Sequence, residues 1–155
     1  MCGIFFTRSD IPADVLRSHS LKSQHRGPEN TSEASIDDIY MSFHRLSING
    51  LDEISNQPIY KHGIYLMCNG EIYNSDYLWS ILKTKKKTNS DCEIIVELYK
   101  YYGIEYTLNA IDGVFAFVLY DIQLDKIIAA RDPFGVRPMF ELETGIGFSS
   151  ELKQL

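Results

Sequence analysis

The sequence lacks a long apolar segment and an excess of basic charge. No run approaches the ~20 apolar residues that a membrane helix needs, and the N-terminus has no signal-peptide pattern. Fifteen Lys and Arg residues stand against 21 Asp and Glu residues, which gives a net charge of −6. Nucleic-acid binders usually carry a basic surface. We therefore expect neither a membrane nor a nucleic-acid partner.

Cysteine and histidine are also scarce. The three cysteines, Cys2, Cys68 and Cys92, form no CxxC motif and are too few for a disulfide framework. The four histidines are scattered without metal-ligand spacing, so we expect no metal site. Sparse cysteines favour a reducing compartment, which predicts a cytoplasmic protein.

The length of 155 residues suits one domain, and hydrophobic patterns indicate mixed secondary structure. Helices are predicted from Pro12 to about Lys22, after an N-cap at Asn74 to about Leu82, and behind a Ser90–Glu93 capping box. The last helix would place Ile94, Ile95, Leu98 and Tyr102 on one face and close at Gly103. Residues 27–37 are polar and predict a surface loop. Seven strands are predicted, at 4–6, at 39–43 leading into residues 45–48, and at 64–68, 114–120, 126–131, 139–142 and 146–149. Antiparallel hairpins dominate, so the fold class is α+β.

Cys2 is notable for its position. Removal of Met1 would leave one residue with both a thiol, of pKa about 8.5, and a free α-amine, of pKa about 7.7–8.0. At neutral pH that amine can take the thiol proton, which activates the thiol as a nucleophile. If Met1 stays attached, the nitrogen is tied up in a peptide bond and the chain is inactive. The alternative is that Cys2 has no chemical role.

Three further features fit the chemistry of amide hydrolysis, and each has an alternative interpretation. Asn69 and Gly70 could donate hydrogen bonds to an oxyanion, or could form a hairpin turn. Arg45 could bind a substrate carboxylate with two prongs, or form a surface ion pair. Asp91 could bind a substrate ammonium group, or simply favour the start of a helix. Together with Cys2 they match the amide, carboxylate and ammonium groups of glutamine.

Eight segments then occur in order along the chain. They are Cys2-Gly3-Ile4, Gln24–Glu29, Arg45–Ile48, Asn69–Asn74, Ser90–Glu93, Asp112–Phe117, Ala130–Gly135 and Ser149–Lys153. This series resembles the N-terminal glutaminase domain of glutamine-dependent asparagine synthetases, within the class II (Ntn-type) glutamine amidotransferases. The Arg45 and Asn69 segments favour the asparagine-synthetase type, whereas residues 131–138 are shared more widely among amidotransferases.

The resemblance implies a four-layer αββα sandwich of the N-terminal-nucleophile hydrolase type, with Cys2 at the end of a central strand. It implies that Cys2 is the nucleophile, that its α-amine is the base, and that Asn69 and Gly70 form the oxyanion hole. No cofactor is expected for the glutaminase reaction. The other implied roles are Arg45 at the glutamine α-carboxylate, Glu71 and Asp91 at its α-amino group, Leu46 and Ile48 in the pocket wall, and Arg26 in ordering the first strand.

We interpret residues 1–155 as a glutaminase domain that is shortened at its C-terminal end and has no synthetase domain. The expected substrate is L-glutamine, with ammonia passing to a synthetase domain or partner chain; the sequence leaves a homodimer open. This chain alone should not make asparagine. One alternative is a non-catalytic glutamine-binding or scaffolding module, and another is a glutaminase that serves a different amidotransferase. A different Ntn-type amide hydrolase would leave Arg45 and Asp91 unpaired.

Overall fold

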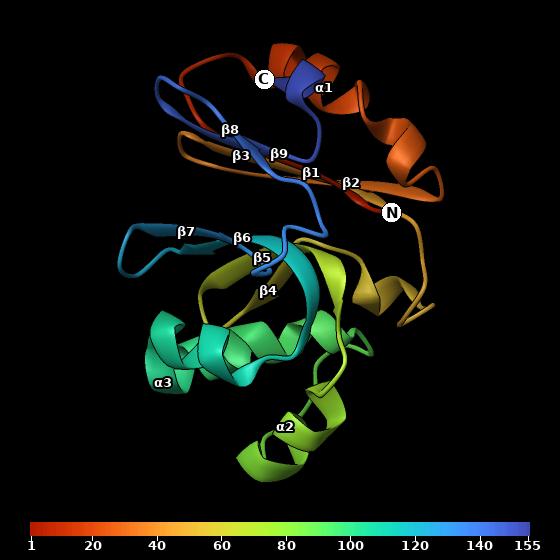
Figure 1. Cartoon of the computed structure of the whole chain (residues 1–155). Coiled ribbons are helices and arrows are strands. Elements are labelled where there is room, and N and C mark those ends of the chain that lie inside the picture. The colour runs from red at the N-terminus through yellow and green to blue at the C-terminus, as the bar shows by residue number, and fades with distance from the viewer.

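Two antiparallel sheets lie face to face in the computed structural model, which describes residues 1–155 (Figure 1). The first sheet has the strand order β2 (Asn30–Ile36), β3 (Ile39–Arg45), β1 (Gly3–Arg8), β9 (Ile146–Ser149) and β8 (Phe140–Glu141). The second has the order β4 (Ile59–Lys61), β5 (Ile64–Ile72), β6 (Gly113–Asp121) and β7 (Lys126–Arg131). Because β1 is the middle strand of its sheet, Cys2 directly precedes a central strand.

Helices lie on the outer faces of the two sheets. Helix α1 (Ala13–Leu21) covers the first sheet, and α2 (Ser75–Leu82) and α3 (Ile94–Ala110) lie beyond the second (Figure 1). The predicted α+β class is confirmed, and the order of helix, sheet, sheet and helix is compatible with a sandwich. None of the helices is both long and apolar enough to cross a membrane.

Alternating side chains hold the layers together. In β1, Ile4 and Phe6 point into the space between the sheets, whereas Phe5 points outward and packs with Leu16 of α1 and with Tyr40. Successive side chains of a strand point to opposite faces, so a strand that is apolar on both faces is covered on both sides. This explains why β1 and β3 have no solvent-facing side.

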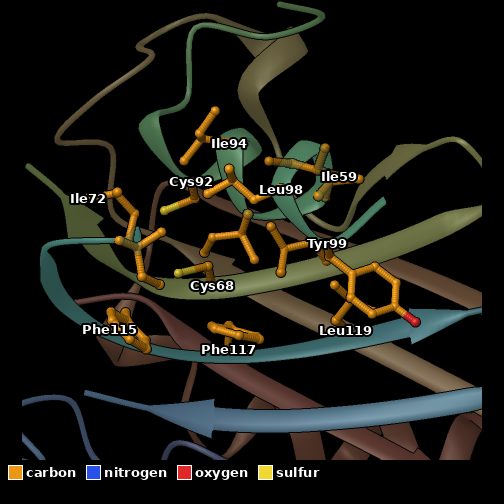
Figure 2. Packing of buried hydrophobic residues seen from close by; sticks show 14 of the residues in the cluster. Ile59, Cys68, Ile72, Cys92, Ile94, Leu98, Tyr99, Phe115, Phe117 and Leu119 are labelled. Atoms are coloured by element: carbon orange, nitrogen blue, oxygen red, sulfur yellow. The ribbon is translucent and has the colours of Figure 1, made fainter. Parts of the chain in front are cut away.

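The largest core lies between the second sheet and its helices (Figure 2). Phe117 and Leu119 of β6 face Ile94 and Leu98 of α3, and all four side chains are almost fully buried. Met67 of β5 points the other way, toward the first sheet. Strand β5 therefore contributes to both cores, and its far end reaches the candidate site described below.

Two strands were missed from the sequence. The prediction of a loop over residues 27–37 was wrong, because Asn30–Ile36 forms the edge strand β2 and pairs with β3 along its whole length. Only its Ala34 and Ile36 pack against the inter-sheet core, so an edge strand can be almost entirely polar. Strand β4 has three residues, which is too short for alternation to be visible.

The second part of α3 was not predicted. Gly103 has φ 79° and ψ 174°, so the helix that begins at Ile94 is interrupted there as predicted, but a second helical stretch follows and runs to Ala110. Tyr102 is 53% exposed and does not lie on the buried face with Ile94 and Leu98. Glycine tolerates a positive φ at little cost, so it permits a kink as readily as an end.

The two predicted caps were right in place and wrong in detail. Ser90 accepts a hydrogen bond from the Cys92 N–H at 3.3 Å, but the Glu93 carboxylate turns back to the N–H groups of Lys87 and Thr88. Asn74 precedes α2 without capping it, and its side chain bridges other backbone groups. The hairpins β6–β7 and β8–β9 are confirmed.

Candidate active site

One cavity collects every residue that the sequence analysis assigned to the site, although their roles stay predictions. It lies where the start of β1 meets the far end of β5. The predicted residues that line it are Cys2, Arg45, Leu46, Ile48, Asn69, Gly70, Glu71 and Asp91. They come from both sheets and from the segment before α3, so packing of the sheets brings them together.

Cys2 is half-buried and lines this cavity. Its sulfur accepts a hydrogen bond from the Leu46 N–H at 3.4 Å and lies 3.5 Å from the Leu46 carbonyl oxygen. Burial raises the pKa of the thiol, and the Leu46 N–H partly offsets that rise. Met1 also lines the cavity, and its attachment ties up the Cys2 nitrogen in a peptide bond.

The backbone around Cys2 is fixed from the C-terminal end of the chain. Arg26 donates from Nε to the Cys2 carbonyl oxygen at 2.9 Å, and its Nη1 lies 3.4 Å from a Glu151 oxygen. Ser150 accepts from the Ile4 N–H at 2.9 Å through its hydroxyl. These contacts agree with the expectation that Arg26 orders the first strand.

Asn69 and Gly70 (hereafter the oxyanion segment) belong to strand β5 and do not form a hairpin turn. They pair with Ala116 and Phe115 of β6, so the turn interpretation is wrong. Asn69 follows Met67 by two residues, and its side chain therefore faces the first sheet and Cys2. Asn69 is 2% exposed, and its Nδ2 is buried without a hydrogen-bond partner. Such a group can donate a hydrogen bond to a ligand oxygen without first losing a protein contact.

The backbone N–H of Gly70 points to the open edge of β5. Alternate residues of an antiparallel strand direct their N–H groups to the same side. On the side away from β6, the Cys68 N–H donates to Gln57 Oε1 at 2.6 Å, and the Ile72 N–H donates to Asp91 Oδ2 at 2.6 Å. Gly70 lies between them and shares their direction. A Cβ at this position would lie 2.4 Å from the Val114 carbonyl oxygen, so glycine is required here.

Arg45 also lines the cavity and is 7% exposed. Its Nη1 donates to Asp52 O at 2.8 Å and to Asn56 Oδ1 at 2.6 Å, and its Nη2 donates to Gly50 O. The surface ion-pair interpretation is therefore wrong, because the partners are neutral groups of the 49–56 loop. A two-pronged contact with a carboxylate would need some of these acceptors to move aside.

Two acidic side chains, those of Asp91 and Glu71, also line the cavity. Asp91 directs its carboxylate to β5, and burial raises its pKa, while the Ile72 N–H partly offsets that rise. Glu71 lies near Asp91, and its Oε1 is 3.5 Å from Arg137 Nη2. Two carboxylates in one cavity favour a cationic ligand group.

Several lining residues were not predicted. Gln57 and Asn49 also line the cavity, but neither stands in a motif that would have identified it. Arg137 lies in the 131–138 segment, which the sequence analysis treated as uninformative for subfamily. The only available signal was that Arg137 belongs to a segment shared among amidotransferases, and that signal does not identify Glu71 as its partner.

Comparison with known proteins decides the family. A model of the glutamine amidotransferase domain matches residues 1–155, which is the entire chain. The chain belongs to the glutamine amidotransferase domain family. This confirms the prediction made from the ordered motifs, and it agrees with a cavity that holds a cysteine, a buried free amide donor and an arginine.

Relatives of this amidotransferase domain include glutamine-hydrolysing asparagine synthetases. The chain is 36% identical to the asparagine synthetase of Zea mays and 41% identical to asparagine synthetase 2 of Oryza sativa subsp. japonica. Both matches cover the whole of the present chain. It is 38% identical to the one from Mus musculus over 96% of its length. The chain spans 28% of the length of each of these relatives.

Proposed function

We propose that this chain hydrolyses the side-chain amide of L-glutamine to glutamate and ammonia, with Cys2 as the nucleophile. The observation that carries the proposal is the placing of the Cys2 sulfur and the free Asn69 amide on one cavity. We further propose that the fold is the four-layer sandwich of the N-terminal-nucleophile hydrolases. In that arrangement removal of Met1 frees the α-amine beside the thiol.

The proposed reaction has two halves. The α-amine takes the thiol proton, the sulfur bonds to the amide carbon, and the carbonyl oxygen becomes an oxyanion that Asn69 Nδ2 and the Gly70 N–H stabilise. Collapse breaks the carbon–nitrogen bond, and the nitrogen leaves as ammonia after receiving the proton. Water then attacks the γ-glutamyl thioester and releases glutamate and the free thiol. Each step uses groups of this chain, so the proposal invokes no cofactor.

The same proposal assigns the ends of the substrate. Arg45 binds the α-carboxylate after the 49–56 loop adjusts, and Glu71 and Asp91 bind the α-ammonium group. The backbone at Leu46 and Ile48 forms part of the wall. The names of the relatives support a synthetase domain or partner chain as the acceptor of the ammonia, and asparagine as the product made there.

The test compares one protein before and after processing. Intact mass establishes whether Met1 is present, and methionine aminopeptidase removes it from a retained sample. We expect glutamate release from L-glutamine only after removal, and no release from a processed Cys2→Ala variant. Acid-quenched samples should carry a γ-glutamyl adduct on the N-terminal peptide. A processed chain that binds glutamine without turnover would instead favour the non-catalytic binding module, and a wild-type rate in Cys2→Ala would refute the mechanism.

A further inference from the structure

Strand β4 stops pairing with β5 just before the oxyanion segment. The backbone ladder between the two strands ends with Ile59 opposite Leu66. Two residues further along this register Gln57 lies opposite Cys68, and here the side chain of Gln57 replaces its backbone. Gln57 Nε2 donates to the Cys68 carbonyl oxygen at 3.1 Å, and the Cys68 N–H donates to Oε1 at 2.6 Å. A carboxamide offers the same donor and acceptor as a peptide group. The Gln57 side chain therefore satisfies the N–H and C=O of Cys68, and no backbone of β4 pairs with β5 beyond this point.

This ending leaves one backbone donor open. The Cys68 and Ile72 N–H groups on this edge are satisfied by Gln57 and Asp91, and the Gly70 N–H lies between them. Had the backbone of β4 continued alongside β5, it would have covered that edge and taken up the donor. Gln57 is 7% exposed, so its carboxamide is held in place and not free in solvent.

The neighbouring residue, Asn56, contacts Arg45, which also lines the cavity. Asn56 Oδ1 accepts from Arg45 Nη1 at 2.6 Å, while Gln57 holds the backbone of Cys68. Two consecutive residues thus connect the proposed carboxylate-binding group with the strand that carries the oxyanion segment. The carboxylate and the amide of glutamine belong to one molecule, so the separation of these two groups must match its length.

We propose that Gln57 is a positioning residue that fixes the oxyanion segment and keeps the Gly70 N–H free to bind the developing oxyanion. The proposal rests on the glutaminase function proposed above. Gln57 acts through the backbone of Cys68 and touches no reacting atom. It should therefore affect the transition state, in which the oxyanion exists, more than it affects the binding of glutamine.

Two variants of the processed chain separate pairing from packing. Gln57→Met keeps the volume and length of the side chain but removes both hydrogen bonds, and Gln57→Ala removes volume as well. We expect kcat for glutamate release to fall by roughly 10-fold to 10²-fold in both variants, because small misplacement of catalytic groups has effects of that order. KM should change less than threefold. A kcat for Gln57→Met within twofold of the wild type would overturn the proposal.

A matched control is available in Gln154. This fully buried carboxamide also accepts from a backbone N–H, that of Glu151, and donates to a backbone carbonyl, that of Ser20, but it does not line the cavity. Gln154→Met should lower the midpoint of urea unfolding much as Gln57→Met does, and should keep kcat. Equal losses of kcat in the two variants would mean a general loss of stability and would overturn the assigned role. A rise in KM at unchanged kcat would mean direct substrate contact and would also overturn it.

A second measurement uses wild-type protein, so it does not require that any variant folds. The aldehyde analogue of glutamine can form a tetrahedral adduct with the Cys2 thiol. In wild-type protein the Cys68 N–H should be protected from hydrogen exchange throughout, and the Gly70 N–H should become protected only in the adduct. An exchanging Cys68 N–H would refute the proposal. If wild-type protein shows neither turnover nor adduct, the proposed glutaminase function itself is refuted. If wild-type protein turns over glutamine and Gln57→Met has the same kcat, only the positioning role is refuted.

Discussion

The Leu46 N–H points at the Cys2 sulfur, with the nitrogen 3.4 Å from Sγ. A backbone donor at this position stabilises a thiolate, and a thiolate is the reactive form of a cysteine nucleophile. Burial nevertheless raises the pKa of the thiol in the chain that retains Met1. The Leu46 N–H therefore favours the thiolate form of Cys2, whereas burial of the sulfur disfavours it and has the larger effect.

This arrangement predicts the pH dependence of thiol alkylation. In folded protein that retains Met1, iodoacetamide should modify Cys2 slowly, with a rate that rises at pH values above the ordinary thiol pKa of about 8.5. Cys68 and Cys92 are buried and should stay unmodified. Removal of Met1 brings the α-ammonium beside the sulfur, so the profile should shift to lower pH. Peptide mapping after timed labelling measures this. If alkylation of Cys2 in protein that retains Met1 rose at a lower pH than alkylation of free cysteine, the prediction would be contradicted.

Asn69 gives a prediction about catalytic rate. Replacing it with alanine removes the buried Nδ2 that has no protein partner. If this group binds the oxyanion, Asn69→Ala should lower kcat for glutamate release by about 10²–10³ with a small change in KM. Urea unfolding of the same sample shows whether the fold is intact. A kcat within a few-fold of the wild type in a folded variant would exclude Asn69 from the oxyanion hole.

Arg45 gives a prediction about substrate affinity. Arg45→Lys keeps the charge but loses the planar fork, so one group can no longer hold the 49–56 loop and a carboxylate together. Loss of one charge-assisted hydrogen bond, about 1.5–3 kcal/mol, should raise KM for glutamine roughly tenfold or more. The control is Arg17→Lys, an exposed arginine that pairs with Glu33, where KM should not change. An unchanged KM in Arg45→Lys would remove Arg45 from the carboxylate site.

The strands of this fold could be predicted wherever apolar residues alternate. Ile39, Met41 and Phe43 identified β3 in this way, whereas the β6–β7 hairpin was identified by two strand-like segments that flank a short turn. The stacking of the sheets could not be predicted from alternation, which shows that a strand has two faces but not which layer covers each; only the family resemblance implied a layered sandwich. The polar strand β2 was missed because an edge strand needs few apolar residues.

The chemical groups of the site were easier to predict than their geometry. Cys2 was identified by its position behind Met1, and the oxyanion segment by its resemblance to a family. The sequence allowed Asn69-Gly70 to be a turn, and only pairing with β6 excludes this. Gln57 carried no signal, since its role depends on the register between β4 and β5, which is a long-range property.

Glu93 gives a prediction about stability and pH. Its buried carboxylate accepts hydrogen bonds from Lys61 Nζ at 2.7 Å and from the backbone N–H groups of Lys87 and Thr88 at 2.8 Å and 2.5 Å. Burial alone would raise its pKa, but these donors hold the pKa below its usual value. The ionised form is thus favoured in the folded chain, and the contacts fix the segment that leads to Asp91.

Because the pKa of Glu93 is lower in the folded chain than in the unfolded one, its contribution to stability is complete above the unfolded pKa of about 4.3 and is lost as the pH falls through the folded value. Glu93→Gln should therefore lower the free energy of unfolding at pH 7 by about 1–3 kcal/mol. The difference in free energy of unfolding between the wild type and Glu93→Gln should become smaller below pH about 4. Asp76→Asn, which removes an exposed carboxylate paired with Lys86, should have little effect at either pH. Urea unfolding of the three proteins across this range measures the difference, and a gap that widens toward acid pH would show that the carboxylate of Glu93 destabilises the fold.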